Sequence, residues 1–103
     1  MDKHLSKNDA ELYRLTDEVL HYLWDPIGVA GIPQARDEYD AYFPHVFSML
    51  KQEVDRTAIS DYLVSIERDY MGLTISDRSR ERTLEIADIL IGHKQCIEER
   101  IMR

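Results

Sequence analysis

The amino-acid sequence predicts an all-helical single domain of about four helices, arranged as a compact bundle or an irregular helical array. Three observations predict this fold class. Apolar residues recur three and four positions apart along almost all of the 103 residues, which is the spacing of amphipathic helices. No stretch alternates apolar and polar residues as a half-buried strand does. Proline and glycine gather in short segments that would separate the helices. The domain is expected to span residues 1–103, with 1–7 as a flexible N-terminus.

The first helix is predicted from a cap and an apolar stripe. Asn8 is followed by Glu11, a pair that would cap the start of a helix. The helix should stop at Trp24, because a following X-Pro pair at Asp25 and Pro26 disfavours helical backbone. Its stripe consists of Leu12, Leu15, Val19, Tyr22 and Leu23.

A loop and a second helix follow. Residues 25–33 hold two prolines and two glycines, and residues 25–28 have the residue types of a type I turn. The second helix should begin near Asp37. Pro44 is expected to kink it or to split off its first turn, because proline removes one backbone donor. The expected buried stripe is Tyr39, Phe43, Val46, Phe47 and Leu50.

Two further helices complete the predicted fold. The third is expected over residues 56–71, with Gly72 as the left-handed residue that ends it. Its stripe is Ile59, Tyr62, Leu63, Ile66 and Tyr70. The fourth should start near Ser76 or Asp77. Its stripe is Leu84, Ala87, Leu90 and Ile91, continued past Gly92 by Ile97 and Ile101.

The charge balance narrows the classes of partner. The formal net charge is −7, which works against binding to the phosphates of nucleic acid and to anionic membrane surfaces. The same charge would attract a basic protein or a cation. An acidic surface that only keeps a small protein soluble is the more common case. We therefore expect no nucleic-acid or membrane partner.

A cytoplasmic location is predicted from the single cysteine and the N-terminus. Cys96 cannot form an intramolecular disulfide, which is typical of a reducing compartment, and we expect it to be a packing residue. The first residues, MDKHLSKNDAEL, lack the apolar stretch of a signal peptide. No apolar run is long enough to span a bilayer.

The string WDPIGVAGIPQARDEYDAYFP, which begins at Trp24, resembles a known family. It is similar to the YugE-like proteins, a family of small bacterial proteins with a WDPIG turn followed by a DEYD-type helix start. The resemblance is clearest over residues 24–50 and continues more loosely at 58–63 and 71–73. It implies a small all-helical fold. It implies no reaction, because the family has no established activity.

The WDPIGV loop is the first candidate site. Trp24 would be an exposed anchor there, with Asp25 beside it, since loops on rigid scaffolds often carry binding residues and tryptophan is common at binding hot spots. Alternatively, Trp24 seals the end of the bundle while Asp25 caps the turn. We favour this structural interpretation, because it explains every residue of the loop.

The second candidate is the acidic, aromatic start of the second helix. Acidic residues in a first helical turn are favoured by the helix dipole, so they need no function. The aromatic residues Tyr39, Tyr42 and Phe43 cannot all point inward from a short helix, however. Aromatic side chains beside carboxylates suit contact with a basic protein. The candidate residues here are Asp37, Glu38, Tyr39, Asp40 and Tyr42.

Metal and anion sites are weaker alternatives. Glu18 and His21 have the E-x-x-H spacing of di-iron bundles, but no second copy exists. His21 could equally form a surface ladder with Asp17 and Asp25. The arginines Arg78, Arg80 and Arg82 are interspersed with Asp77, Glu81 and Glu85, which indicates intrahelical pairing. We therefore predict no metal, no cofactor and no catalytic residue.

The sequence alone does not identify a biochemical task. Our favoured hypothesis is a small, acidic, non-enzymatic protein-interaction module that binds a basic protein through the two candidate sites. An alternative is a small-ligand or metal-binding protein, with or without catalysis, that has a cleft between residues 25–35 and the second helix. That cleft would hold Asp37, Asp40, Tyr42 and His45. A third hypothesis is a homodimer formed through Ile97 and Ile101.

Overall fold

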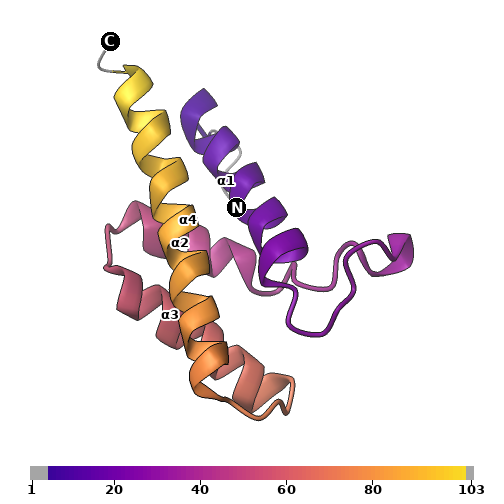
Figure 1. The fold of residues 1–103 in the computed structure, drawn as a ribbon. Coiled ribbons are helices and arrows are strands. Elements are labelled where there is room, and N and C mark those ends of the chain that lie inside the picture. The colour runs from indigo at the N-terminus through magenta and orange to yellow at the C-terminus, as the bar shows by residue number, and fades with distance from the viewer. Residues whose placement is uncertain (1–4, 102–103) are drawn as a thin grey trace.

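The computed structural model describes residues 5–101 and confirms the all-helical class (Figure 1). No strand occurs in this part of the chain. The helices are α1 (Lys7–Val19), α2 (Phe43–Lys51), α3 (Arg56–Ser65) and α4 (Asp77–Ile101). Two π-helical turns, Leu20–Trp24 and Ile66–Tyr70, extend α1 and α3, and a 3₁₀ turn covers Pro33–Ala35. None of the helices in the described range is both long and apolar enough to cross a membrane.

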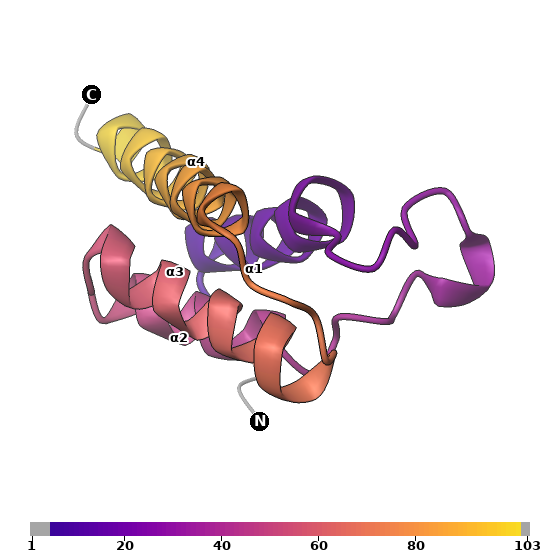
Figure 2. The ribbon, with the colours of Figure 1, turned by 60° about the horizontal axis from the view of Figure 1, so that its bottom comes forward.

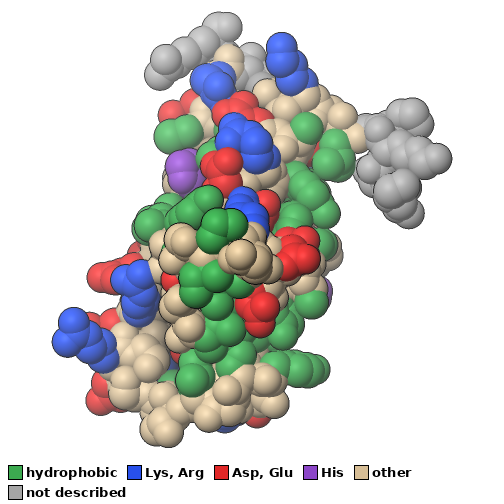
Figure 3. Space-filling model, turned by 90° about the vertical axis from the view of Figure 1, so that its right-hand side faces the viewer, with side chains coloured by type: hydrophobic (Ala, Val, Ile, Leu, Met, Phe, Trp, Pro, Cys, Tyr) green, Lys and Arg blue, Asp and Glu red, His purple; other side chains and the backbone are tan. Residues whose placement is uncertain are grey.

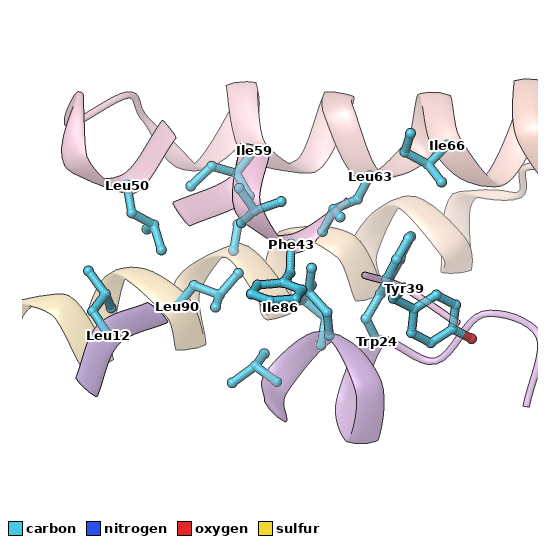
Figure 4. Packing of buried hydrophobic residues seen from close by; sticks show 14 of the residues in the cluster. Leu12, Trp24, Tyr39, Phe43, Leu50, Ile59, Leu63, Ile66, Ile86 and Leu90 are labelled. Atoms are coloured by element: carbon cyan, nitrogen blue, oxygen red, sulfur yellow. The ribbon is translucent and has the colours of Figure 1, made fainter. Parts of the chain in front are cut away.

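The helices pack around α4, which contacts α3 and α1 along its length, while α2 packs against α1. The segment 25–42 extends away from the packed helices in both ribbon views (Figures 1 and 2). One apolar cluster fills the centre and draws residues from every helix (Figure 4). Its members include Leu12, Leu20, Trp24, Tyr39, Phe43, Val46, Leu50, Ile59, Leu63, Ile66, Ile86, Ala87, Leu90 and Ile97.

The start of α1 differs from the prediction. Ser6, not Asn8, is the N-cap, and its side chain accepts a hydrogen bond from the Asp9 amide at 3.0 Å. Serine and asparagine both cap helices well, and here the helix begins directly after the earlier of the two, Ser6. Lys7 is therefore the first residue of α1, which corrects the end of the predicted flexible segment 1–7. Residues 1–4 of that segment lie outside the described residues.

The second helix also begins later than predicted. Residues 36–42 form successive turns, and α2 starts at Phe43 with Pro44 in its first turn. Proline is tolerated there because the first helical amides have no intrahelical partner. Of the two effects expected from Pro44, the splitting off of the first turn is the one observed. Tyr39 nevertheless lies in the core, only 2% exposed.

The end of the third helix is confirmed in position but not in its helical type. Gly72 adopts the left-handed conformation expected of it, with φ +68°. Before it, the Met71 amide donates to the Ile66 carbonyl five residues back, at 3.1 Å. Such a π turn holds more residues than an α turn, so it rotates Tyr70 off the buried face. Tyr70 is 74% exposed, and its prediction as a core residue is wrong.

Helix α4 follows its predicted course. It begins at Asp77 behind a reciprocal pair, in which the Ser79 amide donates to Ser76 Oγ at 3.1 Å and the Ser76 amide donates to Ser79 Oγ at 3.2 Å. Ala87, Leu90 and Ile97 are buried as expected, and Ile86 joins them. Cys96 is exposed, so its prediction as a packing residue is wrong.

Gly72→Ala and Gly92→Ala should shift stability in opposite directions. An added Cβ meets no atom within 4 Å at either position. Gly72 has positive φ, where alanine is strained, so Gly72→Ala should destabilise the protein by about 1 kcal/mol. Gly92 lies inside α4, so Gly92→Ala should stabilise it by about 0.5–1 kcal/mol. Urea unfolding of both variants measures the two effects, and shifts of the same sign would contradict this account of the two glycines.

Candidate interaction surface

Asp25 fixes the conformation of the WDPIGV loop. Its backbone is left-handed, with φ +32°, and its carbonyl accepts the Gly28 amide at 3.2 Å, as the predicted turn requires. Its carboxylate accepts the Val29 amide at 2.7 Å and the Ala30 amide at 3.0 Å. The Tyr39 hydroxyl donates to the same carboxylate at 2.8 Å. The Asp25 side chain therefore forms hydrogen bonds both within the loop and with a tyrosine of the core.

The titration of Asp25 and Tyr39 reflects this contact. Burial alone would raise the pKa of Asp25, but the hydrogen bonds from Tyr39, Val29 and Ala30 outweigh it and lower that pKa. Burial and the bond to the Asp25 carboxylate raise the pKa of the Tyr39 hydroxyl. At neutral pH, the pair is therefore a carboxylate that accepts from a neutral phenol.

Trp24 is a structural residue in this fold. It is 3% exposed, and its ring centroid lies 5.2 Å from that of Tyr39. The two rings lie side by side at one end of the core (Figure 4). The interpretation of Trp24 as an exposed anchor is thus wrong, and so is an exposed role for the Tyr39 ring. The alternative, in which Trp24 seals the end of the bundle, describes the structure.

Glu67 is a buried partner of Trp24 that the sequence analysis missed. The Trp24 indole N–H donates to Glu67 Oε2 at 2.8 Å, and this bond joins the two π turns. Burial raises the pKa of Glu67, although the Trp24 bond and the charge of Arg82 act in the opposite direction. A pattern could have indicated it, because Glu67 lies four residues after Leu63 and so continues the buried stripe of α3.

Arg82 also has a role that its sequence context did not indicate. Its guanidinium donates to the Leu23 carbonyl near the end of the π turn. None of Arg78, Arg80 and Arg82 forms an ion pair with a described residue, so the predicted intrahelical pairing is wrong. Trp24, Glu67 and Arg82 line a hollow of about 350 Å³ beside the start of α4.

The predicted carboxylates at residues 37–40 lie on the surface. Asp37, Glu38 and Asp40 are exposed. Asp37 and Asp40 join Asp17 of α1 around an open depression, which we call the acidic hollow. Its lining residues are Asp17, Pro33, Gln34, Arg36, Asp37 and Asp40. Red carboxylates and green apolar side chains lie beside each other on the face that carries the segment 25–42 (Figure 3).

The acidic hollow keeps an excess of negative charge. Arg36 is its only basic lining residue, and it forms two hydrogen bonds with Asp17, at 3.0 and 3.1 Å. Neither Asp37 nor Asp40 forms an ion pair with any described residue. Burial and the like charges of Asp17 and Asp37 raise the pKa of Asp40. A nearby cation would relieve this repulsion.

A second depression, the apolar hollow, adjoins the first. Its lining residues are His21, Tyr22, Gly31, Ile32, Pro33 and Arg36. Tyr22 is 53% and Ile32 47% exposed. The Arg36 guanidinium lies over the Tyr22 ring, 5.4 Å from its centroid, a cation–π distance.

His21 does not form the predicted surface ladder with Asp17 and Asp25. It is 2% exposed, and its Nδ1 has no hydrogen-bond partner. Glu18 instead pairs with Arg14 at 3.1 Å. No group of three or more His, Cys, Asp or Glu side chains within residues 5–101 is arranged to hold a metal ion.

The predicted ligand cleft is only partly assembled. Asp37 and Asp40 share the acidic hollow, but His45 and Tyr42 do not line it. His45 instead stacks against Tyr62, with ring centroids 4.4 Å apart. Tyr42 is half-buried between Trp24 and Tyr70, with centroid distances of 6.5 and 6.4 Å. The four residues predicted to line one cleft therefore do not lie together: Asp37 and Asp40 line the acidic hollow, whereas Tyr42 and His45 pack against other aromatic rings.

Comparison of the chain with protein-family models, with curated proteins and with solved structures gives no match. The resemblance of residues 24–50 to the YugE-like proteins therefore stays a prediction.

Proposed function

We propose that this protein is a non-enzymatic interaction module of the bacterial cytoplasm that binds a basic protein. The exposed carboxylates Asp37, Glu38 and Asp40 would form the contact. One observation carries the proposal: Asp37 and Asp40 share a hollow with Asp17, while the only arginine of that hollow is held by Asp17. The negative charge is therefore concentrated and left available for a partner.

A lysine or arginine of a partner would gain from this arrangement. Together with burial, the negative charges of Asp17 and Asp37 raise the pKa of Asp40. A positive charge from the partner would offset the repulsion among these carboxylates. The net charge of −7 would also speed the encounter with a basic protein. Because the carboxylates are exposed, the attraction is screened by salt, with a Debye length of about 10 Å at 0.1 M and about 3 Å at 1 M. Salt dependence is thus a direct test of the proposed contact.

Neutralising the three carboxylates should weaken capture of the partner. The variant combines Asp37→Asn, Glu38→Gln and Asp40→Asn. We expect its affinity to fall by about threefold to a hundredfold, because each exposed ion pair contributes modestly. The measurement is a pull-down from source-cell lysate, with retained proteins identified by mass spectrometry. Retention by the unaltered protein should fall steeply as salt rises to about 1 M.

The matched control changes the net charge equally, at exposed positions that line neither hollow. It combines Asp61→Asn, Glu85→Gln and Glu99→Gln. A partner that recognises the acidic hollow is retained by this control and lost by the first variant. If both variants retain the same proteins as the unaltered chain, the proposed contact is wrong. If both lose them equally, only total charge matters, and the proposed location is wrong.

A small cationic ligand is the second candidate, favoured by the exposed carboxylates of Asp37 and Asp40, which form no ion pair with a described residue. Its test is a thermal-shift screen with metal ions and organic amines. A shift that disappears in the Asp37, Glu38 and Asp40 variant would favour it over a protein partner. Of the two residues in the homodimer hypothesis, Ile97 cannot contact a second copy, because it is buried in the core of its own chain. The side chain of Ile101 lies outside the described residues.

A further inference from the structure

The two hollows share part of their lining. Pro33 and Arg36 belong to both of them, so an occupant of one hollow borders the other. One side of this shared border is lined by carboxylates, and the other by Tyr22 and Ile32. At the border, Arg36 is bound to Asp17 and lies over the Tyr22 ring, which is still 53% exposed.

Exposed apolar residues are concentrated in the part of the chain that includes Tyr22 and Ile32. Six large hydrophobic side chains are exposed among the described residues, and four of them come from residues 22–32. These four are Tyr22, Leu23, Ile27 and Ile32. Single exposed apolar residues are ordinary on a protein surface, but a concentration of them marks a contact site. Two of the four, Tyr22 and Ile32, line the apolar hollow, which adjoins the carboxylates of Asp37 and Asp40.

The shape of the surface favours protein side chains over a small molecule. Both hollows are open depressions, whereas a small-ligand site encloses most of its ligand. A peptide is held instead by neighbouring side chains, each in its own shallow depression. The pairing of Arg36 with Asp17 also leaves the carboxylates of Asp37 and Asp40 without an ion pair to a described residue, so a basic side chain need not displace Arg36 from them.

We infer that the two hollows form one docking surface for a peptide segment that carries a basic side chain close to a large apolar one. The lysine or arginine would lie at Asp37 and Asp40, and the apolar side chain against Tyr22 and Ile32. This inference rests on the proposed function and adds the chemical pattern of the partner. In an extended segment, the two side chains would be within about two residues of each other, since each residue spans about 3.3 Å.

The test is selection of a random peptide library, displayed on phage, against the immobilised full-length protein. We expect enriched peptides to pair Lys or Arg with Leu, Ile, Phe or Met within about two residues. The best peptide is then synthesised, and its affinity is measured by fluorescence anisotropy. Affinity should fall about tenfold or more with Asp37→Asn/Asp40→Asn, and likewise with Tyr22→Ser/Ile32→Ser, because each hollow loses its recognition chemistry.

The control replaces exposed apolar residues elsewhere. Tyr70 and Ile89 are 74% and 38% exposed and line neither hollow, so Tyr70→Ser/Ile89→Ser should leave the affinity unchanged. All variants alter surface residues, and circular dichroism verifies their folding. NMR spectra of the isotopically labelled protein should show peptide-induced shifts at Asp17 and at residues 21–40, with the His21 ring as an internal reporter of the apolar hollow.

The outcomes separate this inference from the proposed function. Basic peptides without an apolar preference, unaffected by Tyr22→Ser/Ile32→Ser, would overturn the shared docking surface and leave the acidic contact standing. Peptides that are insensitive to Asp37→Asn/Asp40→Asn would overturn both. A selection with no enrichment over an uncoated surface, or shifts that map away from Asp17 and residues 21–40, would overturn the docking surface.

Discussion

Trp24→Ala should destabilise the protein by about 3–5 kcal/mol, the range for removal of a large buried aromatic side chain. The indole is 3% exposed and contacts the Tyr39 ring. Its loss leaves a cavity at the end of the core and also removes the donor to Glu67, a residue that is only 7% exposed. Chemical denaturation with urea, followed by far-ultraviolet circular dichroism, measures the change in the free energy of unfolding.

Trp24→Phe separates the hydrogen bond from the packing. Phenylalanine keeps most of the apolar volume but has no N–H, so the expected loss is about 1–3 kcal/mol, the range for a buried polar group left without its partner. A double-mutant cycle with Glu67→Gln isolates the coupling between the two side chains. A Trp24→Phe protein as unstable as Trp24→Ala would assign the whole effect to the hydrogen bond, against our account.

The pH dependence of Trp24→Phe provides an independent check. The folded pKa of Glu67 is raised, so in the window above its unfolded value of 4.5 the folded state binds more protons than the unfolded state. Stability therefore falls as pH rises through that window. Loss of the Trp24 donor removes an influence that lowers the pKa, so this fall should become steeper. An unchanged slope would show that Trp24 does not stabilise the charged form of Glu67.

Local chemistry explains what the sequence could predict. Gly72 acts through its tolerance of positive φ, and Pro44 acts through its missing backbone N–H. A helix end and a displaced helix start could therefore both be predicted. The loop after Trp24 was predicted for the same reason. The buried faces of α3 and α4 were mostly foreseeable as well, because burial follows the period of the helix.

The remaining features depend on contacts between distant residues. Trp24 and Glu67 are 43 positions apart, and Arg36 and Asp17 are 19 apart. No periodicity encodes such pairs. The π turns rotate Tyr70 outward through an added residue in the turn, which an α-helical period cannot anticipate. The candidate carboxylates were identified by their place beside aromatic residues at the predicted helix start. The apolar hollow beside them combines the π turn Leu20–Trp24 with the following loop, and it becomes visible only in three dimensions.

Asp25→Ala should destabilise the protein by about 2–4 kcal/mol, because hydrogen bonds to a charged group contribute more than neutral ones. The substitution removes the acceptor for the Val29 and Ala30 amides and for the Tyr39 hydroxyl. It also places alanine at positive φ, where aspartate and asparagine are better tolerated. The measurement is again urea unfolding.

Two milder variants divide this effect. Tyr39→Phe removes the hydroxyl, which donates to Asp25 and accepts the Ile27 amide at 3.4 Å, and should cost about 0.5–1.5 kcal/mol. Asp25→Asn keeps the left-handed backbone and one acceptor oxygen, so its loss should fall between those of Tyr39→Phe and Asp25→Ala. A Tyr39→Phe variant as unstable as Asp25→Ala would mean that the loop amides contribute nothing.

Acid titration of stability tests whether the charge of Asp25 matters as well as its hydrogen-bonding geometry. The folded pKa of Asp25 lies below its ordinary value of 3.8, so in the window just below 3.8 the unfolded state binds more protons. The stabilisation by Asp25 is therefore complete above that value and is lost as pH falls through the folded pKa. In Asp25→Asn this acid-dependent loss should be absent, and the difference in stability from the unaltered protein should shrink below about pH 3.8. A constant difference across this range would show that the loop depends on the shape of the side chain and not on its charge. In that case the Asp25 side chain would hold residues 25–30 in the same conformation whether or not it is charged. The part of the apolar hollow that the loop lines would then form equally well in acid.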